Sequence, residues 1–400
     1  MTTATRFTQA LAPEFFDRVQ ERVRSRLVEE NLDAILTDDP EDVAYLTGFF
    51  HHPCERPVAV WLAADGPTVL LTPRLERENA ERQQARARIV SYVEFPGIEA
   101  PFATLATEVD RVGAGGGLRV GFTTHMTHER LAAVRRELPS AVYQPTTVVT
   151  RARYVKFDEE IALHREAARI TDLMLDAGVA LVREAVAAGG RLPSEAELAS
   201  RVTGTGVSTM YAEHDNVVVV APLAGGLVYA GPNSAFPHGL PSGYQLSPGD
   251  TFMLSLGCAV GGRFVEGERT FVLGTPTSDQ IRFHDTIHRA QSIGGQAIRP
   301  GTECREANAA CLAVIEEAGL GEYIRHRQGH GIGLGMHEPP WLEAGDETLL
   351  QPGMIVSNEP GIYVPGHAGY RISDSMLVTE SGSVPLTAFP RGLVDCTIQL

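Results

Sequence analysis

The pattern of predicted helices and strands changes at residues 146–157, and this boundary constrains the fold more than any other feature of the sequence. Before it, short apolar runs such as residues 58–62 and 68–72 alternate with helix-prone segments, which predicts an α/β layer with a mixed sheet. After it come a long helical stretch, residues 158–188, and a glycine-rich half with several β-rich runs. This half predicts an α+β arrangement, in which a curved antiparallel sheet carries helices on its back. We therefore expect an N-terminal domain over residues 1–150 and a C-terminal domain over residues 151–400.

Composition excludes several classes of partner. The 400 residues include 34 Lys and Arg against 50 Asp and Glu, a net charge of −16, whereas a protein that coats nucleic acid needs a basic face. No apolar run approaches the roughly 20 residues that span a bilayer. Residues 1–12 contain no apolar stretch of the kind found in secretory signals, and the five cysteines form no CxxC pair. We expect a cytoplasmic protein that acts on a small-molecule substrate, without a nucleic-acid or membrane partner.

Histidines and carboxylates gather in the second half of the chain. A single histidine is easily explained as a surface or loop residue, but here several are framed by glycines and prolines and lie close to acidic residues in the sequence. Histidine moves protons near neutral pH, and carboxylates orient it or stabilise charge. The pattern indicates an active site built from five short stretches: residues 236–239, 264–270, 329–340, 358–363 and 369–374.

These stretches resemble the pita-bread family of aminopeptidase P, prolidase and creatinase. The likeness rests mainly on Gly-His-Gly-Ile-Gly-Leu-Gly-Met-His-Glu at residues 329–338 and on Glu-Pro-Gly-Ile-Tyr at residues 359–363. Tyr-Leu-Thr-Gly-Phe at residues 45–49 resembles the N-terminal domain of the same family. The resemblance implies a creatinase-like α/β N-terminal domain, an α+β pita-bread (creatinase/aminopeptidase) catalytic domain and a homodimer.

The departures from this family concern the metal ligands. Its peptidases bind two metal ions through Asp, Asp, His, Glu and Glu, and the resemblance places Ser255, Glu266, His330, Glu359 and Ser373 at those positions. A hydroxyl is a weak ligand beside carboxylate and imidazole, so a dinuclear centre is not expected. Glu266, His330 and Glu359 leave three donors, which is enough for one catalytic ion in principle.

Other positions resemble creatinase, the metal-free branch of the family. Ser255 lies in a Leu-Ser-Leu segment that lacks the first Asp, as in creatinase, and Glu268 opens a Glu-Arg-Thr segment in which creatinase has its substrate-gripping Glu. His238 falls at the position of the catalytic histidine, and Glu359 at that of a second substrate-binding Glu. Arg56 resembles the arginine that reaches across the dimer to hold the substrate carboxylate.

The sequence thus predicts a metal-independent hydrolase of a non-peptide C–N bond in a small amidine-like or cyclic substrate, without a cofactor. Without a metal to lower the pKa of water, His238 is expected to act as general base and then as general acid. One alternative is a Xaa-Pro dipeptidase or aminopeptidase with a single metal, and another is a non-catalytic relative that binds a ligand. The predicted catalytic residues are His238, Glu268, His330, His337 and Glu359, and the predicted substrate-binding residues are Arg56, Glu266 and Arg371.

Overall fold

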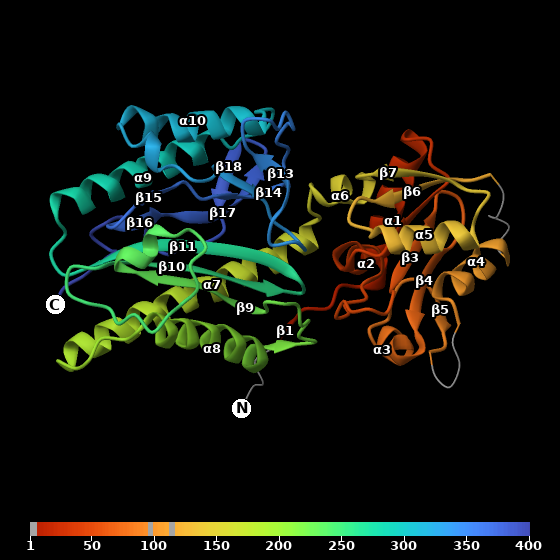
Figure 1. Ribbon diagram of the computed structural model, residues 1–400, viewed down its shortest axis with the longest axis horizontal. Coiled ribbons are helices and arrows are strands. Elements are labelled where there is room, and N and C mark those ends of the chain that lie inside the picture. The colour runs from red at the N-terminus through yellow and green to blue at the C-terminus, as the bar shows by residue number, and fades with distance from the viewer. Residues whose placement is uncertain (1–5, 95–98, 112–116) are drawn as a thin grey trace. The chain divides into compact units, whose positions relative to one another are not determined.

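The computed structural model describes residues 6–94, 99–111 and 117–400. They form two compact units, one made of residues 6–10 and Tyr154–Leu400 and the other of Leu11–Arg153 (Figure 1). The first five residues, on which part of the signal-peptide argument rests, lie outside the described residues. The predicted fold class, an α/β N-terminal domain followed by an α+β pita-bread domain, is confirmed.

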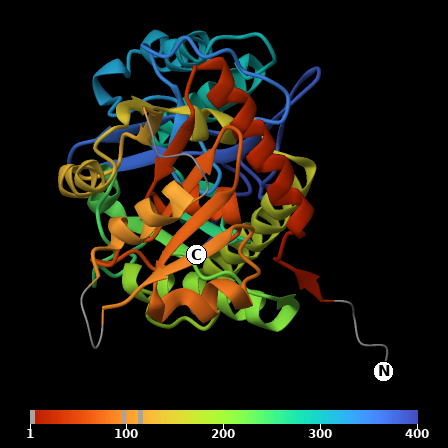
Figure 2. The same cartoon turned by 90° about the vertical axis from the view of Figure 1, so that its right-hand side faces the viewer.

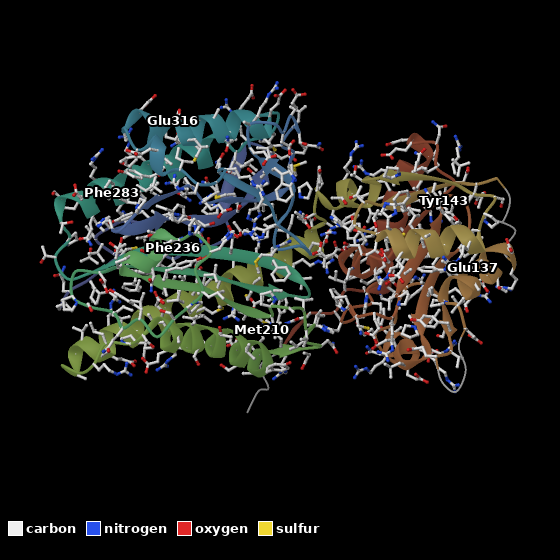
Figure 3. The ribbon with its side chains drawn as sticks, viewed as in Figure 1. Glu137, Tyr143, Met210, Phe236, Phe283 and Glu316 are labelled. Carbon is white, nitrogen blue, oxygen red and sulfur yellow. The ribbon has the colours of Figure 1, made fainter. Side chains whose placement is uncertain are left out.

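The unit Leu11–Arg153 is built on a six-stranded mixed sheet in the order β5-β4-β3-β2-β6-β7. The predicted hairpin is β3 with β4, and β2 also pairs antiparallel with β3, whereas the remaining pairs are parallel. Helices flank this sheet (Figure 2), and α4 and α5 share a core with it, which includes Trp61 and Leu105. The strands are β2 (Ala34–Thr37), β3 (Ala59–Ala63), β4 (Thr68–Pro73), β5 (Arg88–Tyr92), β6 (Arg119–Thr123) and β7 (Val142–Thr146), and the helices are α1 (Pro13–Glu29), α2 (Pro40–Thr47), η1 (Arg74–Glu76), α3 (Arg77–Arg82), α4 (Pro101–Arg111), α5 (His128–Glu137) and α6 (Val148–Arg153).

The second unit contains a nine-stranded sheet in the order β13-β12-β14-β17-β11-β10-β9, with β18 paired to β17 and β19 to β11. Figure 1 shows the strands between two helix pairs, α7 with α8 on one side and α9 with α10 on the other. Two small sheets, β1 with β8 and β15 with β16, complete the unit. The strands are β1 (Phe7–Thr8), β8 (His214–Asp215), β9 (Ala224–Ala230), β10 (Thr251–Val260), β11 (Arg263–Leu273), β12 (Gly329–Gly331), β13 (Glu338–Leu342), β14 (Ile355–Asn358), β15 (Gly361–Val364), β16 (Ala368–Arg371), β17 (Ser373–Thr379), β18 (Gly382–Pro385) and β19 (Thr397–Ile398), and the helices are α7 (Asp158–Ala187), α8 (Glu195–Glu213), η2 (Gly231–Ala235), α9 (Ser278–Ala297), α10 (Cys304–Glu317) and η3 (Gly321–Tyr323).

Helix α8 was not expected, because its glycines and β-branched residues disfavour a helix. Two features outweigh this propensity. Ser194 and Glu197 form a capping box at its start, with the Ser194 backbone N–H donating to Glu197 Oε2 at 2.8 Å. Gly206 allows close packing on α7, since a Cβ there would lie 2.7 Å from Met174 Sδ. Among the described residues, no helix is both long and apolar enough to cross a bilayer.

Candidate active site

The nine-stranded sheet brings together the five positions at which the family resemblance places metal ligands. Ser255 lies on β10, Glu266 on β11, His330 on β12, Glu359 just after β14, and Ser373 at the start of β17. They line or adjoin a cavity of about 740 Å³. Seven of the eight predicted site residues line this cavity: His238, Glu266, Glu268, His330, His337, Glu359 and Arg371.

His330 is the centre of one half of the site. Its Nδ1 lies 2.9 Å from the backbone oxygen of Gly331, which can only accept, so Nδ1 carries a proton and Nε2 is the ring nitrogen that faces the cluster. Nε2 lies 3.1 Å from Glu359 Oε1 and 3.6 Å from Glu266 Oε2, and it is buried without a well-directed hydrogen-bond partner among the described residues. A divalent cation between this nitrogen and the two carboxylates would replace the proton on Nε2, which is how metal binding couples to the protonation of a histidine ligand.

His337 adds a fourth donor to the cluster of His330, Glu266 and Glu359. The ring of His337 stands edge-on to the ring of His330, with 4.2 Å between the centroids. One possible ligand atom from each of Glu266, His330 and His337 lies within 4.8 Å of the others. Together with Glu359, these residues fit one divalent cation, and the convergence of two carboxylates on His330 Nε2 is the observation that favours it.

The electrostatics of this half favour added positive charge. Burial and the neighbouring charge of Glu359 raise the pKa of Glu266 to about 8. Burial lowers the pKa of His330, but the carboxylates of Glu266 and Glu359 outweigh it and raise that pKa to about 9. Burial also opposes ionisation of Glu359, yet the contact with His330 lowers its pKa to about 2. Carboxylate charge therefore dominates the cluster, and protons or a cation must balance it.

The other half of the site contains an arginine. Arg371 Nε lies 2.5 Å from Glu268 Oε2, and the exposed fraction of each side chain is 5%. Arg371 Nη2 donates to Ser255 Oγ at 2.9 Å, and Ser255 Oγ in turn donates to Glu268 Oε1. Ser373 Oγ donates to Glu266 Oε1 at 2.8 Å. Both serines that replace carboxylate ligands thus act as hydrogen-bond donors, so the residues do not fit a dinuclear metal centre.

Residues 162–380 match the sequence pattern of metallopeptidase family M24. The chain belongs to this family. Residues 20–155 match the creatinase/prolidase N-terminal domain, so the two matches follow the two units of the fold.

Similar proteins of this family are dipeptidases by name. A "Probable dipeptidase PepE" of Mycobacterium tuberculosis is 33% identical over 88% of this chain and 89% of its own length. The structure of an Xaa-Pro dipeptidase from Bacillus anthracis is 28% identical, with a TM-score of 0.82 over 96% of this chain and 100% of that one. The structure of dipeptidase PepE from Mycobacterium ulcerans is 27% identical, with a TM-score of 0.83 over 98% and 100% of the two chains.

These findings correct the predicted function. The family resemblance is confirmed and the chain is a hydrolase of the M24 family, but the prediction of a metal-independent hydrolase of a non-peptide C–N bond is wrong, because the relatives are dipeptidases. The error came from giving the serines at positions 255 and 373 more weight than the three donors that remained for a single ion. The donors around His330 remain together, and His337, which was expected only to act in catalysis, is within reach as a further ligand.

Two predicted residues lie apart from the His330 cluster. His238 is an exposed residue in a turn that follows η2, and it lines the cavity. Arg56 belongs to the unit Leu11–Arg153, where it forms ion pairs with Glu55 at 2.8 Å and Glu94 at 2.7 Å. Its role across a dimer stays a prediction.

The sequence interpretation missed His326, a residue of the cavity wall. His326 lines the cavity, and its Nε2 lies 2.9 Å from the Tyr363 hydroxyl, which also accepts from Arg371 Nη1 at 2.9 Å. A signal for His326 was present, because it lies four residues before His330 in His-Arg-Gln-Gly-His. The contact between Lys156 and Glu338 was not foreseen either, and their buried charges lie 3.1 Å apart.

Proposed function

We propose that this M24 chain hydrolyses the peptide bond of dipeptides, with one divalent cation held by Glu266, His330 and either His337 or Glu359. The observation that carries the proposal is the convergence of these donors, within 4.8 Å for three of them, in the wall of a 740 Å³ cavity. Cavities of about 300–1,000 Å³ suit small ligands, and the named relatives include an Xaa-Pro dipeptidase.

The cation would polarise the scissile carbonyl and lower the pKa of a water molecule. The chain supplies the remaining functions. Glu266 and Glu359 balance the charge of the cation, and the Gly331 carbonyl fixes the tautomer of His330 that leaves Nε2 free to bind it. His238 is exposed and lines the cavity, which supports a role in which it delivers a proton to the leaving nitrogen.

The cavity also offers positive charge for the substrate carboxylate. Arg325 lines it, and within the described residues its guanidinium donates to the backbone oxygens of Glu322 and Ile324 rather than to a carboxylate. Arg327 also lines it, but this side chain is already paired with Glu343 at 2.7 Å and stacked 4.0 Å from the centroid of Trp341. Arg325 is therefore the better candidate for the carboxylate of a dipeptide.

The test uses full-length protein stripped of metal with a chelator. Hydrolysis of dipeptides with proline or alanine as the second residue should vanish on stripping and return with Mn²⁺, Co²⁺ or Zn²⁺. His330→Ala should bind the ion at least tenfold more weakly, whereas His128→Ala, which removes an exposed histidine of the other unit, should not change binding. Undiminished hydrolysis by metal-free protein, or no hydrolysis of any dipeptide after metal is restored, would refute the proposal.

A further inference from the structure

A carboxylate faces Ser255 from the neighbouring strand. In the antiparallel pair of β10 and β11, Ser255 and Glu268 are direct partners, and Leu254 and Arg269 are the next pair. The Ser255 hydroxyl donates to Glu268, whose other oxygen lies 2.5 Å from Arg371 Nε. Position 255 therefore lacks a carboxylate, while the residue directly across the ladder supplies one.

The guanidinium of Arg371 is fixed on several sides. Besides Glu268, it contacts Ser255 Oγ through Nη2 and the Tyr363 hydroxyl through Nη1, each at 2.9 Å. The residue is 4% exposed, and Glu268 is 4% exposed. A buried arginine needs a carboxylate as counter-ion, and among the described residues Arg371 forms its ion pair with Glu268. Glu268 therefore serves as the counter-ion of Arg371.

This ion pair determines how much negative charge remains in the cavity to bind a cation. The charged groups around this pair that line the cavity are Glu266 and Glu268, which are buried, Glu359, whose side chain is 13% exposed, and the guanidinium of Arg371. Their formal sum, 1 − 3 = −2, equals the charge that one divalent cation neutralises. A second divalent cation beside Ser255 would face the Arg371 guanidinium, and its nearest side-chain partner would be a hydroxyl.

We propose that Glu268 and Arg371 form an internal ion pair in place of a second metal ion, so that the site binds one divalent cation and not two. This inference rests on the proposed function for the identity of the bound cation. Arg371 is a positioning residue here: it occupies the half of the site around Ser255 and keeps Glu268 from acting as a metal ligand.

The first test counts bound ions in the unmodified protein. Metal-free protein titrated with Mn²⁺ should bind one equivalent by calorimetry and elemental analysis, and its electron paramagnetic resonance spectrum should be that of an isolated ion. Two equivalents with a spin-coupled spectrum would overturn the inference even if dipeptides are hydrolysed. One equivalent without dipeptide hydrolysis would support the inference and overturn the proposed function alone, and zero equivalents would overturn both.

The second test restores the two missing carboxylates. The double variant Ser255→Asp/Ser373→Glu should take up a second Mn²⁺, because it adds two negative charges while Glu268 still neutralises Arg371. Its matched control is Ser200→Glu/Ser208→Asp, which adds the same residues at exposed positions of α8 and should still bind one ion. If the control also bound a second ion, added negative charge anywhere on the protein would explain the uptake, and this result would count against the inference.

The third test separates a counter-ion from a ligand. If Glu268 serves Arg371, Glu268→Gln alone should lower the thermal midpoint and weaken Mn²⁺ binding, because it leaves the Arg371 charge unbalanced in the cavity. Glu268→Gln with Arg371→Met removes both charges, so it should leave the Mn²⁺ dissociation constant within about threefold and cost less stability than the sum of the single variants. A loss of more than tenfold in Mn²⁺ affinity in the double variant, or strictly additive effects on stability, would overturn the pairing.

Discussion

Arg269 and Asp374 form an ion pair whose two side chains have no solvent exposure, and we predict that Arg269→Met strongly destabilises the catalytic unit. Arg269 Nη2 lies 2.8 Å from Asp374 Oδ1. Its Nη1 donates to the backbone oxygens of Glu268 and Ser373, each at 2.7 Å. The guanidinium thus ties β11 to β17 at two residues of the site.

The magnitude follows from what remains after the substitution. Removing one partner of a buried pair costs about 3–5 kcal/mol, because it leaves an uncompensated charge. Asp374 keeps a second arginine, Arg391, whose Nε lies 2.5 Å from Oδ2, so the lower end of this range, about 3 kcal/mol, applies. For a unit of about 250 residues, 1 kcal/mol shifts the thermal midpoint by about 2–4 °C, which gives a decrease of about 6–12 °C.

Differential scanning calorimetry of the full chain measures this decrease, and two variants calibrate it. Arg391→Met removes the outer arginine, which is 28% exposed, and should lower the midpoint by only about 2–4 °C. Arg269→Lys should fall between the two, because an ammonium keeps the charge but cannot make the forked contacts of a guanidinium. A decrease for Arg269→Met no larger than that for Arg391→Met would refute the reasoning.

Three further predictions concern acid stability, the loop before His330 and assembly. Burial lowers the pKa of His164 to about 3, so the unfolded chain takes up its proton first, near pH 6.5; stability is complete above that pH and falls by about 2 kcal/mol by pH 5, and His164→Gln should flatten the thermal midpoint between pH 7 and 5. Gly329→Ala should lower the midpoint by several degrees, because its Cβ would lie 2.1 Å from the Ser357 backbone oxygen, whereas Gly345→Ala meets nothing within 4 Å and should be neutral. The chain should sediment as a homodimer at micromolar concentration, and Arg56→Ala should raise KM without lowering the midpoint; a monomer would contradict both the assembly and the role of Arg56.

Much of the fold followed from local patterns. The predicted helix over residues 158–188 is α7, Asp158–Ala187, because three acidic residues open it and no proline interrupts it. The hairpin of β3 and β4 followed from two β-rich runs around Asp-Gly-Pro. Helix α8 was not predicted: the capping box of Ser194 and Glu197 is a local signal for its start, but the contacts of Gly206 with α7 and β9 are visible only in the fold.

The sequence identified most residues of the candidate site, but it did not show which of them contact one another. The register of β10 and β11 was in fact encoded by Gly261 and Gly262, a two-residue turn with both φ angles positive, which sets Val260 opposite Arg263 and hence Ser255 opposite Glu268. By contrast, the proximity of Glu266, His330 and Glu359 depends on how β12, β14 and β17 join β11. The residues in contact lie up to about a hundred positions apart in the sequence, and no rule of sequence spacing predicts such contacts.

The mistaken prediction of a metal-independent enzyme shows why ligands must be counted by charge as well as by position. The ligand set implied by the family resemblance has four carboxylates for two divalent cations, so the loss of two was taken as the loss of the site. Here Glu268 and Arg371 neutralise each other, and the carboxylates left over, Glu266 and Glu359, carry the charge of one divalent cation. The substitutions at Ser255 and Ser373 then remove one ion together with its charge, and the ratio of two carboxylates to one cation is preserved. Substitutions that keep two carboxylates for each cation are compatible with metal binding around His330. The further loss of Glu266 or Glu359 would leave too little negative charge for even one divalent cation.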